Sequence, residues 1–221
     1  MQEDWPRLLV QAASVLGITL QERQVGLFTR YHREFTAWNE KINLLSRRFS
    51  EDTLLRHFLD SLTAVAFLPG RDCTVLDMGS GGGLPGIPLK IAVDTLKISL
   101  LEASRKKTSF LKHIIRTLQI TDIKVIHDRA EKLRKQETYR DSFEMVLSRA
   151  AFKLPEFIAL GAFFLAPGGT LMAMKGADIR AELEEAEPAA AASGLYLSAS
   201  HDLSLPLTGE RRRILIYQKS L

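Results

Sequence analysis

The residues best suited to chemistry in this chain are an acidic residue and three alternate glycines after an apolar run. The apolar run ends at Asp77, and Gly79, Gly81 and Gly83 follow it. Glycines let the backbone turn sharply and approach a ligand without a clash from Cβ. Amide groups at the start of a following helix would then face that ligand. The pattern predicts a nucleotide-like ligand bound where a strand turns into a helix.

Two ligand classes fit this glycine-rich turn. The dinucleotide pattern G-x-G-x-x-G matches Gly81, Gly83 and Gly86, but it leaves Gly79 unexplained. The pattern acidic-x-G-x-G-x-G runs from Asp77 through Gly83 and begins directly after the apolar run. The second pattern is the better fit and favours S-adenosylmethionine. A nicotinamide cofactor and a purely structural glycine turn remain as alternatives.

Polar residues also end the next three strand candidates along the chain, which are the second, third and fourth. Glu102 lies 19 residues beyond Gly83, where a carboxylate can accept hydrogen bonds from both ribose hydroxyls. Residues 128–131 end the third candidate, where an adenine edge would lie. Arg149 ends the fourth and would point into the reaction cleft, because strand carboxyl ends line such a site. A buried structural ion pair is the competing interpretation of Arg149.

Short β-rich runs alternate with helical stretches from Cys73 onward. The strand candidates are 74–78, 97–101, 123–126, 143–147, 170–174, 196–200 and 214–217. The helical stretches are 85–93, 104–118, 154–165 and 179–192. Strands joined by helices predict an α/β, Rossmann-like sheet that is mostly parallel and covered on both faces. The last two strands lack a helix between them, so the last strand is expected to be antiparallel.

The first part of the chain is predicted to be helical. Asp4 can cap a first helix, and Thr19 with Glu22 forms a capping-box pattern that opens a longer one. Ser50 begins a third helix. The polar, basic segment 43–48 between the second and third helices is predicted to be a surface loop.

Composition and charge favour one soluble enzyme domain with an accessory segment. We expect an N-terminal helical segment, 1–70, and a methyltransferase domain, 71–221. The net charge is +4, but residues 71–177 alone carry an excess of six positive charges. Such an excess around a reaction site would attract a polyanion such as nucleic acid, although solvated helix faces also explain it. The absence of a signal peptide or apolar span and the single Cys73 favour the cytoplasm.

Several segments resemble the RsmG family, also called GidB. They are Asp77–Pro88, Glu102–Lys107 with Phe110 and Leu111, Ser148–Ala150, and in the first 70 residues Asn43-Leu44, Arg56-His57 and Asp60-Ser61. The resemblance covers nearly the whole chain, from Trp5 to Tyr217. This family often has proline where this chain has Gly82, and usually aspartate where it has Glu102.

The resemblance implies a class I methyltransferase that uses S-adenosylmethionine to methylate N7 of a guanine in 16S ribosomal RNA. By the same resemblance, the cofactor contacts map to Gly79, Leu84, Glu102, Ala103, Ser104, Ala130, Glu131 and Arg149; Gly81 is added from the glycine pattern. The implied partner is 16S ribosomal RNA or a precursor of the small ribosomal subunit. We expect a monomer with no membrane contact.

The absence of other catalytic patterns is consistent with this chemistry. Guanine N7 has a lone pair and no proton, so no general base is required, and no catalytic side chain is assigned. The five histidines show no spacing typical of metal ligands, so no metal is expected. Catalysis would come mainly from holding the base and the methyl group in line.

RNA binding needs cations for the phosphates and flat groups for exposed bases. The candidate RNA contacts are Arg47, Arg48, Arg56, His57, Lys106 and Lys107, with Lys175 and Arg211–Arg213 as weaker ones. The alternative interpretation of Arg56 is an intrahelical ion pair with Asp60, four residues away. The alternative for Arg211–Arg213 is a solvated turn. Other functions left open are methylation of a small molecule or protein, nicotinamide-dependent oxidoreduction and non-catalytic RNA chaperoning.

Overall fold

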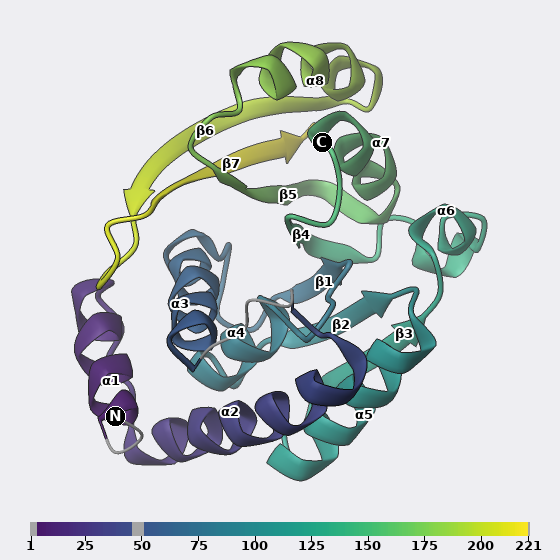
Figure 1. Ribbon diagram of the computed structural model, residues 1–221. Coiled ribbons are helices and arrows are strands. Elements are labelled where there is room, and N and C mark those ends of the chain that lie inside the picture. The colour runs from purple at the N-terminus through teal and green to yellow at the C-terminus, as the bar shows by residue number, and fades with distance from the viewer. Residues whose placement is uncertain (1–3, 46–50, 221) are drawn as a thin grey trace.

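A single seven-stranded sheet forms the centre of the molecule (Figure 1). The computed structural model describes residues 4–45 and 51–220. The strand order is β3-β2-β1-β4-β5-β7-β6. Only β7 runs antiparallel, and it pairs with β5 on one side and β6 on the other. The strands are β1 (Thr74–Met78), β2 (Lys97–Glu102), β3 (Ile123–His127), β4 (Phe143–Arg149), β5 (Leu165–Gly176), β6 (Leu195–Ser204) and β7 (Arg211–Lys219).

Helices cover both faces of this sheet (Figure 1). On the side of one face, α4 (Gly86–Ala92) and α5 (Arg105–Leu118) contact the strands. Packed with them in the same core are α1 (Trp5–Val15), α2 (Glu22–Ile42), α3 (Glu51–Leu62) and the short 3₁₀ helix η1 (Thr63–Phe67). The other face packs against α6 (Ala130–Leu133), α7 (Leu154–Phe164) and α8 (Arg180–Ala192). A second 3₁₀ helix, η2 (Glu137–Tyr139), precedes β4. None of the helices in the described ranges has both the length and the apolar character needed to cross a membrane.

Side-chain alternation along the strands assigns each residue to one of these faces. Val75 of β1 joins the core on the α1–α5 side, whereas Leu76 and Met78 join the core on the α6–α8 side. Asp77 alternates with Leu76 and therefore faces α4, and its carboxylate accepts a hydrogen bond from the first residue of that helix. The period of two along β1 thus places Asp77 on the side of the sheet that α4 covers.

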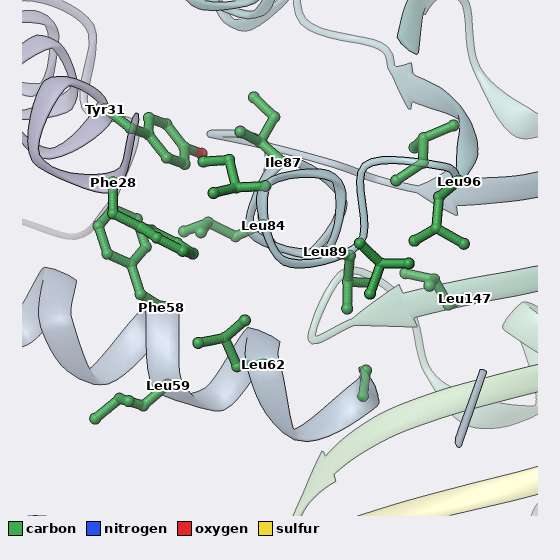
Figure 2. Close-up of a cluster of buried hydrophobic side chains, with 14 of the residues drawn as sticks. Phe28, Tyr31, Phe58, Leu59, Leu62, Leu84, Ile87, Leu89, Leu96 and Leu147 are labelled. Carbon is green, nitrogen blue, oxygen red and sulfur yellow. The ribbon is translucent and has the colours of Figure 1, made fainter. Parts of the chain in front are cut away.

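The N-terminal helices share one apolar core with the sheet (Figure 2). Phe28 and Tyr31 of α2 meet Phe58 of α3, with ring centroids 5.3 Å and 5.1 Å apart. Leu84 and Ile87, from the turn and helix after β1, join the same cluster. The helical segment therefore lies directly over the glycine-rich turn. The proposed division into 1–70 and 71–221 concerns chain organisation, because the hydrophobic core is continuous across it.

All seven predicted strands are present, and Asp4 precedes the first helix as predicted, but the capping of the first two helices differs in detail. Helix α2 starts at Glu22, and its capping box joins Gln21 to Gln24 and not Thr19 to Glu22. Asp4 holds the cap position of α1 without a side-chain cap, because its carboxylate pairs with Arg7 at 3.2 Å. The predicted start at Ser50 lies outside the described residues.

Candidate active site

A cavity of about 690 Å³ opens at the carboxyl ends of β1, β2 and β4. Its lining falls into two halves. One half comes from the glycine-rich turn, the ends of β2 and β3 and the first turn of α5, and the other from α3, the ends of β4 and β5, and the start of β7. Leu44 and Leu45, which follow α2, also line the cavity. Of the predicted cofactor residues it contains Gly79, Gly81, Leu84, Glu102, Ala103, Ala130, Glu131 and Arg149. This is the edge at which an open α/β sheet binds its ligands.

Glu102 connects the two loops of the first half. Its Oε2 accepts a hydrogen bond from the backbone N–H of Gly81 at 2.9 Å, and its Oε1 accepts one from Ser104 at 2.7 Å. The side chain is 8% exposed, so both bonds form in a region mostly shielded from water. Each carboxylate oxygen keeps a second lone pair that can accept a ribose hydroxyl. The geometry therefore fits a nucleoside, as the sequence predicted for this carboxylate.

The alternate glycines do different things. A Cβ on Gly79 would lie 2.4 Å from Cβ of Ala151, so this residue must be glycine for packing and for its φ of +76°. Gly81 has a φ of +57°, and a Cβ there would meet nothing closer than 3.9 Å. Open space in front of Gly81 leaves room for a ligand against the main chain. At Gly82, where the family often has proline, a Cβ would lie 2.5 Å from the Phe35 ring.

Asp77 is a structural residue of this turn and does not line the cavity. Its Oδ2 accepts a hydrogen bond from the N–H of Gly86 at 3.0 Å, whereas Oδ1 has no partner among the described residues. Burial raises the pKa of Asp77 to about 7, because the charged form loses its hydration, although the bond from Gly86 and the charge of Arg149 oppose the shift. The carboxyl group thus fixes the start of α4 at an electrostatic cost.

Ser104 is the one predicted cofactor residue whose side chain serves the fold and does not line the cavity. Its hydroxyl caps α5 by accepting a hydrogen bond from the N–H of Lys107. Asp128 and Arg129 join Ala130 and Glu131 at the end of β3 and complete this half of the lining. The residues predicted to contact the cofactor therefore lie around one cavity, except Ser104, whose backbone N–H donates to Glu102; their contact with a cofactor stays a prediction.

Arg149 satisfies both interpretations made from the sequence. It lines the cavity, and its Nη1 donates to Oδ2 of Asp60 at 3.1 Å and to Nδ1 of His57 at 3.0 Å. Arg212 of β7 donates through Nε to the other oxygen of Asp60 at 3.2 Å. The side chains of Arg149, Asp60 and Arg212 are at most 17% exposed. A residue of α3 thus joins two strands that are far apart in the sequence.

The structure separates the predicted RNA contacts. His57 and Lys107 line the cavity, Lys106 is exposed beside it, and Arg47 and Arg48 lie outside the described residues. Arg56 pairs with Glu210 of another segment at 3.4 Å and not with Asp60, so the alternative of an intrahelical pair was wrong, and the RNA contact of Arg56 remains a prediction.

The weaker candidates also find protein partners. Lys175 lines the cavity but pairs with Glu182 at 2.7 Å. Arg211–Arg213 begin strand β7 and are not a solvated turn, and Arg213 pairs with Asp202 at 2.6 Å. Sequence reasoning missed Asp60 and Phe152 as lining residues. Asp60 was named through the family resemblance and as a possible ion-pair partner of Arg56, but not as a lining residue. Phe152 had a detectable signal, since it follows Arg149 by three residues at the same strand end.

No group of three or more potential metal ligands occurs within residues 4–45 and 51–220. Nor does the cavity contain a serine or cysteine paired with a histidine in a nucleophilic arrangement among the hydrogen bonds of its lining residues. The lining residues can bind and orient ligands and can balance their charge.

The strand order with a single antiparallel β7 defines the class I methyltransferase fold. TYW2 of M. jannaschii, solved in complex with AdoMet, has this fold, with a TM-score of 0.61 at 15% identity over 79% of this chain and 78% of that one. The O-methyltransferase of Bacillus cereus, solved in complex with SAH, gives a TM-score of 0.59 at 18% identity over 86% of this chain and 90% of that one.

Sequence comparison identifies the family. The model of the family rRNA small subunit methyltransferase G (GidB) matches residues 24–213, and the chain belongs to this family. Ribosomal RNA small subunit methyltransferase G of Syntrophus aciditrophicus is 44% identical over 98% of this chain and 90% of its own length. The protein of that name from Geotalea uraniireducens is 36% identical over 99% of both chains. This membership removes the nicotinamide-dependent alternative.

Asp77→Asn tests the buried carboxyl group. Between pH 3.8, the ordinary pKa of an aspartate, and about pH 7, Asp77 stays protonated in the folded protein but loses its proton in the unfolded chain. The stability of the wild-type protein should therefore fall as the pH rises through that range. Asparagine keeps the acceptor for Gly86 and does not titrate. From about pH 5 to about pH 8 the variant should therefore gain roughly 3 kcal/mol relative to the wild type. Urea unfolding at both pH values measures this, and a constant difference between the two proteins would refute it.

Proposed function

We propose that this protein transfers a methyl group from S-adenosylmethionine to N7 of a guanine in 16S ribosomal RNA. The observation that carries the proposal is family membership across residues 24–213. The site supports it, because one cavity has a carboxylate half suited to a nucleoside and a second half walled by flat and cationic side chains. We further propose that the protein acts as a monomer in the cytoplasm, on 16S ribosomal RNA or a precursor of the small subunit.

In this proposal the first half of the cavity holds the cofactor. Glu102 would accept the ribose hydroxyls, while Ala130 and Glu131 would border the adenine. The open space in front of the Gly81 main chain would hold the main body of the cofactor. When bound, S-adenosylmethionine supplies an electrophilic methyl group on a sulfonium. The residues that the family implies are proposed cofactor contacts of this half, except Arg149, which ends β4 in the second half and would contact the cofactor from there.

The reaction needs positioning more than proton transfer. N7 of guanine forms a bond to the methyl carbon with its own lone pair as the S–C bond breaks, and the electron pair of that bond stays on sulfur. No proton moves, but the purine gains a positive charge. Asp60 and Glu210 pair with Arg149 and Arg212, so the wall of the second half carries little uncompensated charge beside the developing cation.

A basic rim beside the first half offers a surface for RNA phosphates. It is defined as six cationic residues on the β2–α5 loop side and around α6, all but Lys107 being exposed: Lys106, Lys107, Arg129, Lys132, Arg134 and Lys135. None of them forms an ion pair with another part of the chain that the structure describes. Unpaired cations along one edge provide the sequence-independent attraction that RNA binding requires.

A methyl-transfer assay tests the reaction. Small ribosomal subunits, total protein and a metabolite extract from cells that lack the gene are each incubated with the enzyme and methyl-labelled cofactor. Label should enter 16S ribosomal RNA as N7-methylguanosine on hydrolysis. The Glu102→Ala variant, which leaves two loop N–H groups unpaired, should lose at least about tenfold in rate. Label only in protein or small molecules would refute the proposal.

Charge reversal on the basic rim tests RNA binding. Lys132→Glu with Lys135→Glu should weaken binding to 16S ribosomal RNA and make the plot of log affinity against log salt shallower by about 0.7–0.9 per lost phosphate contact. Lys97→Glu with Lys124→Glu is a matched control, because these exposed lysines lie near the amino ends of β2 and β3. Equal salt dependence in the two double variants would exclude the rim as an RNA surface.

A further inference from the structure

The protonation of His57 is defined by its partner. Nδ1 of His57 lies 3.0 Å from Nη1 of Arg149. A guanidinium has only donors, so Nδ1 must accept and therefore carries no proton. The single proton of the neutral ring then belongs to Nε2. His57 thus presents an N–H group in a defined tautomer.

The surroundings keep the ring neutral. The pKa of His57 is lowered to about 3, chiefly because burial disfavours the charged ring; the charges of Arg149, Arg56 and Arg212 act in the same direction and outweigh that of Glu210. His57 lines the cavity, and the only hydrogen-bond partner of its imidazole ring among the described residues is Arg149. Among the residues that the structure describes, the Nε2–H group consequently has no acceptor, and the ring lies at the wall of the half opposite Glu102.

Guanine presents two acceptors on one edge, N7 and O6. A reacting N7 must keep its lone pair free for the methyl group, so a bidentate arginine fork across both atoms would block the reaction. The arginines here already serve carboxylates and the histidine ring, because Arg149 donates through Nη1 to His57 and Asp60, and Arg212 donates to Asp60 and Glu210. A single N–H donor aimed at O6 identifies the base and leaves N7 available.

We propose that the Nε2–H group of His57 donates a hydrogen bond to O6 of the target guanine, and that Asp60 is a positioning residue that holds Arg149 against Nδ1. The inference rests on the proposed function and adds the residue that recognises the base. A neutral donor also suits the charge change, since the purine becomes positive as the methyl arrives and a cationic imidazole would oppose it. Adenine would be rejected, because it presents an amino donor at the position of O6.

Substitution of His57 separates base recognition from cofactor binding. In single-turnover methylation of small ribosomal subunits, His57→Ala should lower the rate about tenfold, the value of one such hydrogen bond. S-adenosylhomocysteine affinity, measured by calorimetry, should stay within about twofold of wild type. His57→Gln should recover most of the loss, because its amide N–H can replace Nε2–H. His201→Ala, on β6 beside Phe67, is the matched control and should change neither quantity.

Three results would overturn the inference: an unchanged rate in His57→Ala, a parallel fall in S-adenosylhomocysteine affinity, or no recovery in His57→Gln. The first would show that the donor has no role, and the second that it holds the cofactor. If the wild-type protein does not methylate RNA, the proposed function itself fails. If it does and His57→Ala is fully active, only the inference fails.

Imidazole nitrogen NMR on the unaltered protein gives a test that does not depend on variant folding. With S-adenosylhomocysteine bound, guanosine monophosphate should shift the Nε2–H resonance of His57, and adenosine monophosphate should not. Nδ1 should show the signature of an unprotonated nitrogen throughout. Equal shifts with both nucleotides, or a protonated Nδ1, would contradict the proposed contact.

Discussion

A buried carboxylate on a helix outside the sheet holds the second half of the cavity together. The two oxygens of Asp60 accept hydrogen bonds from Arg149 at the end of β4 and Arg212 at the start of β7. Removing one member of such a buried pair typically costs about 3–5 kcal/mol, because the remaining charge has no partner. Asp60 therefore makes docking of α3 a condition for an assembled site. The shared apolar core of α2, α3 and the glycine-rich turn serves the same end (Figure 2).

The two halves of the cavity differ in how they treat charge. In the first, the Glu102 carboxylate is held by two backbone N–H groups and remains able to accept hydroxyl groups. In the second, carboxylates of Asp60 and Glu210 balance the arginines. A methyl transfer that moves a positive charge from sulfur to a purine needs both environments and no base. The absence of a recognisable catalytic side chain in the sequence follows from this chemistry.

Local sequence patterns were enough to predict the fold and which residues gather in the first half of the site. The second half could not be predicted, because it depends on pairs between residues far apart in the sequence. Glu102 could be placed near Gly81 because β1 and β2 are adjacent parallel strands that end at the same edge, with Asp77 opposite Leu100. The pair of Arg56 with Glu210 could not be predicted, because Asp60 is nearer in the sequence and has the helical spacing of an ion-pair partner. Arg212 looked like part of a basic turn, and only the β5–β7 pairing brings it to the cavity.

The division of the cavity into a cofactor half and a base half is the central claim. A crystal structure of the protein with S-adenosylhomocysteine tests it directly. The account predicts ribose hydroxyls bonded to Glu102, adenine beside Ala130, and an open space flanked by His57 and Phe152 in front of the sulfur. A nucleoside bound instead against His57 and Arg212, with Glu102 free of it, would contradict the account.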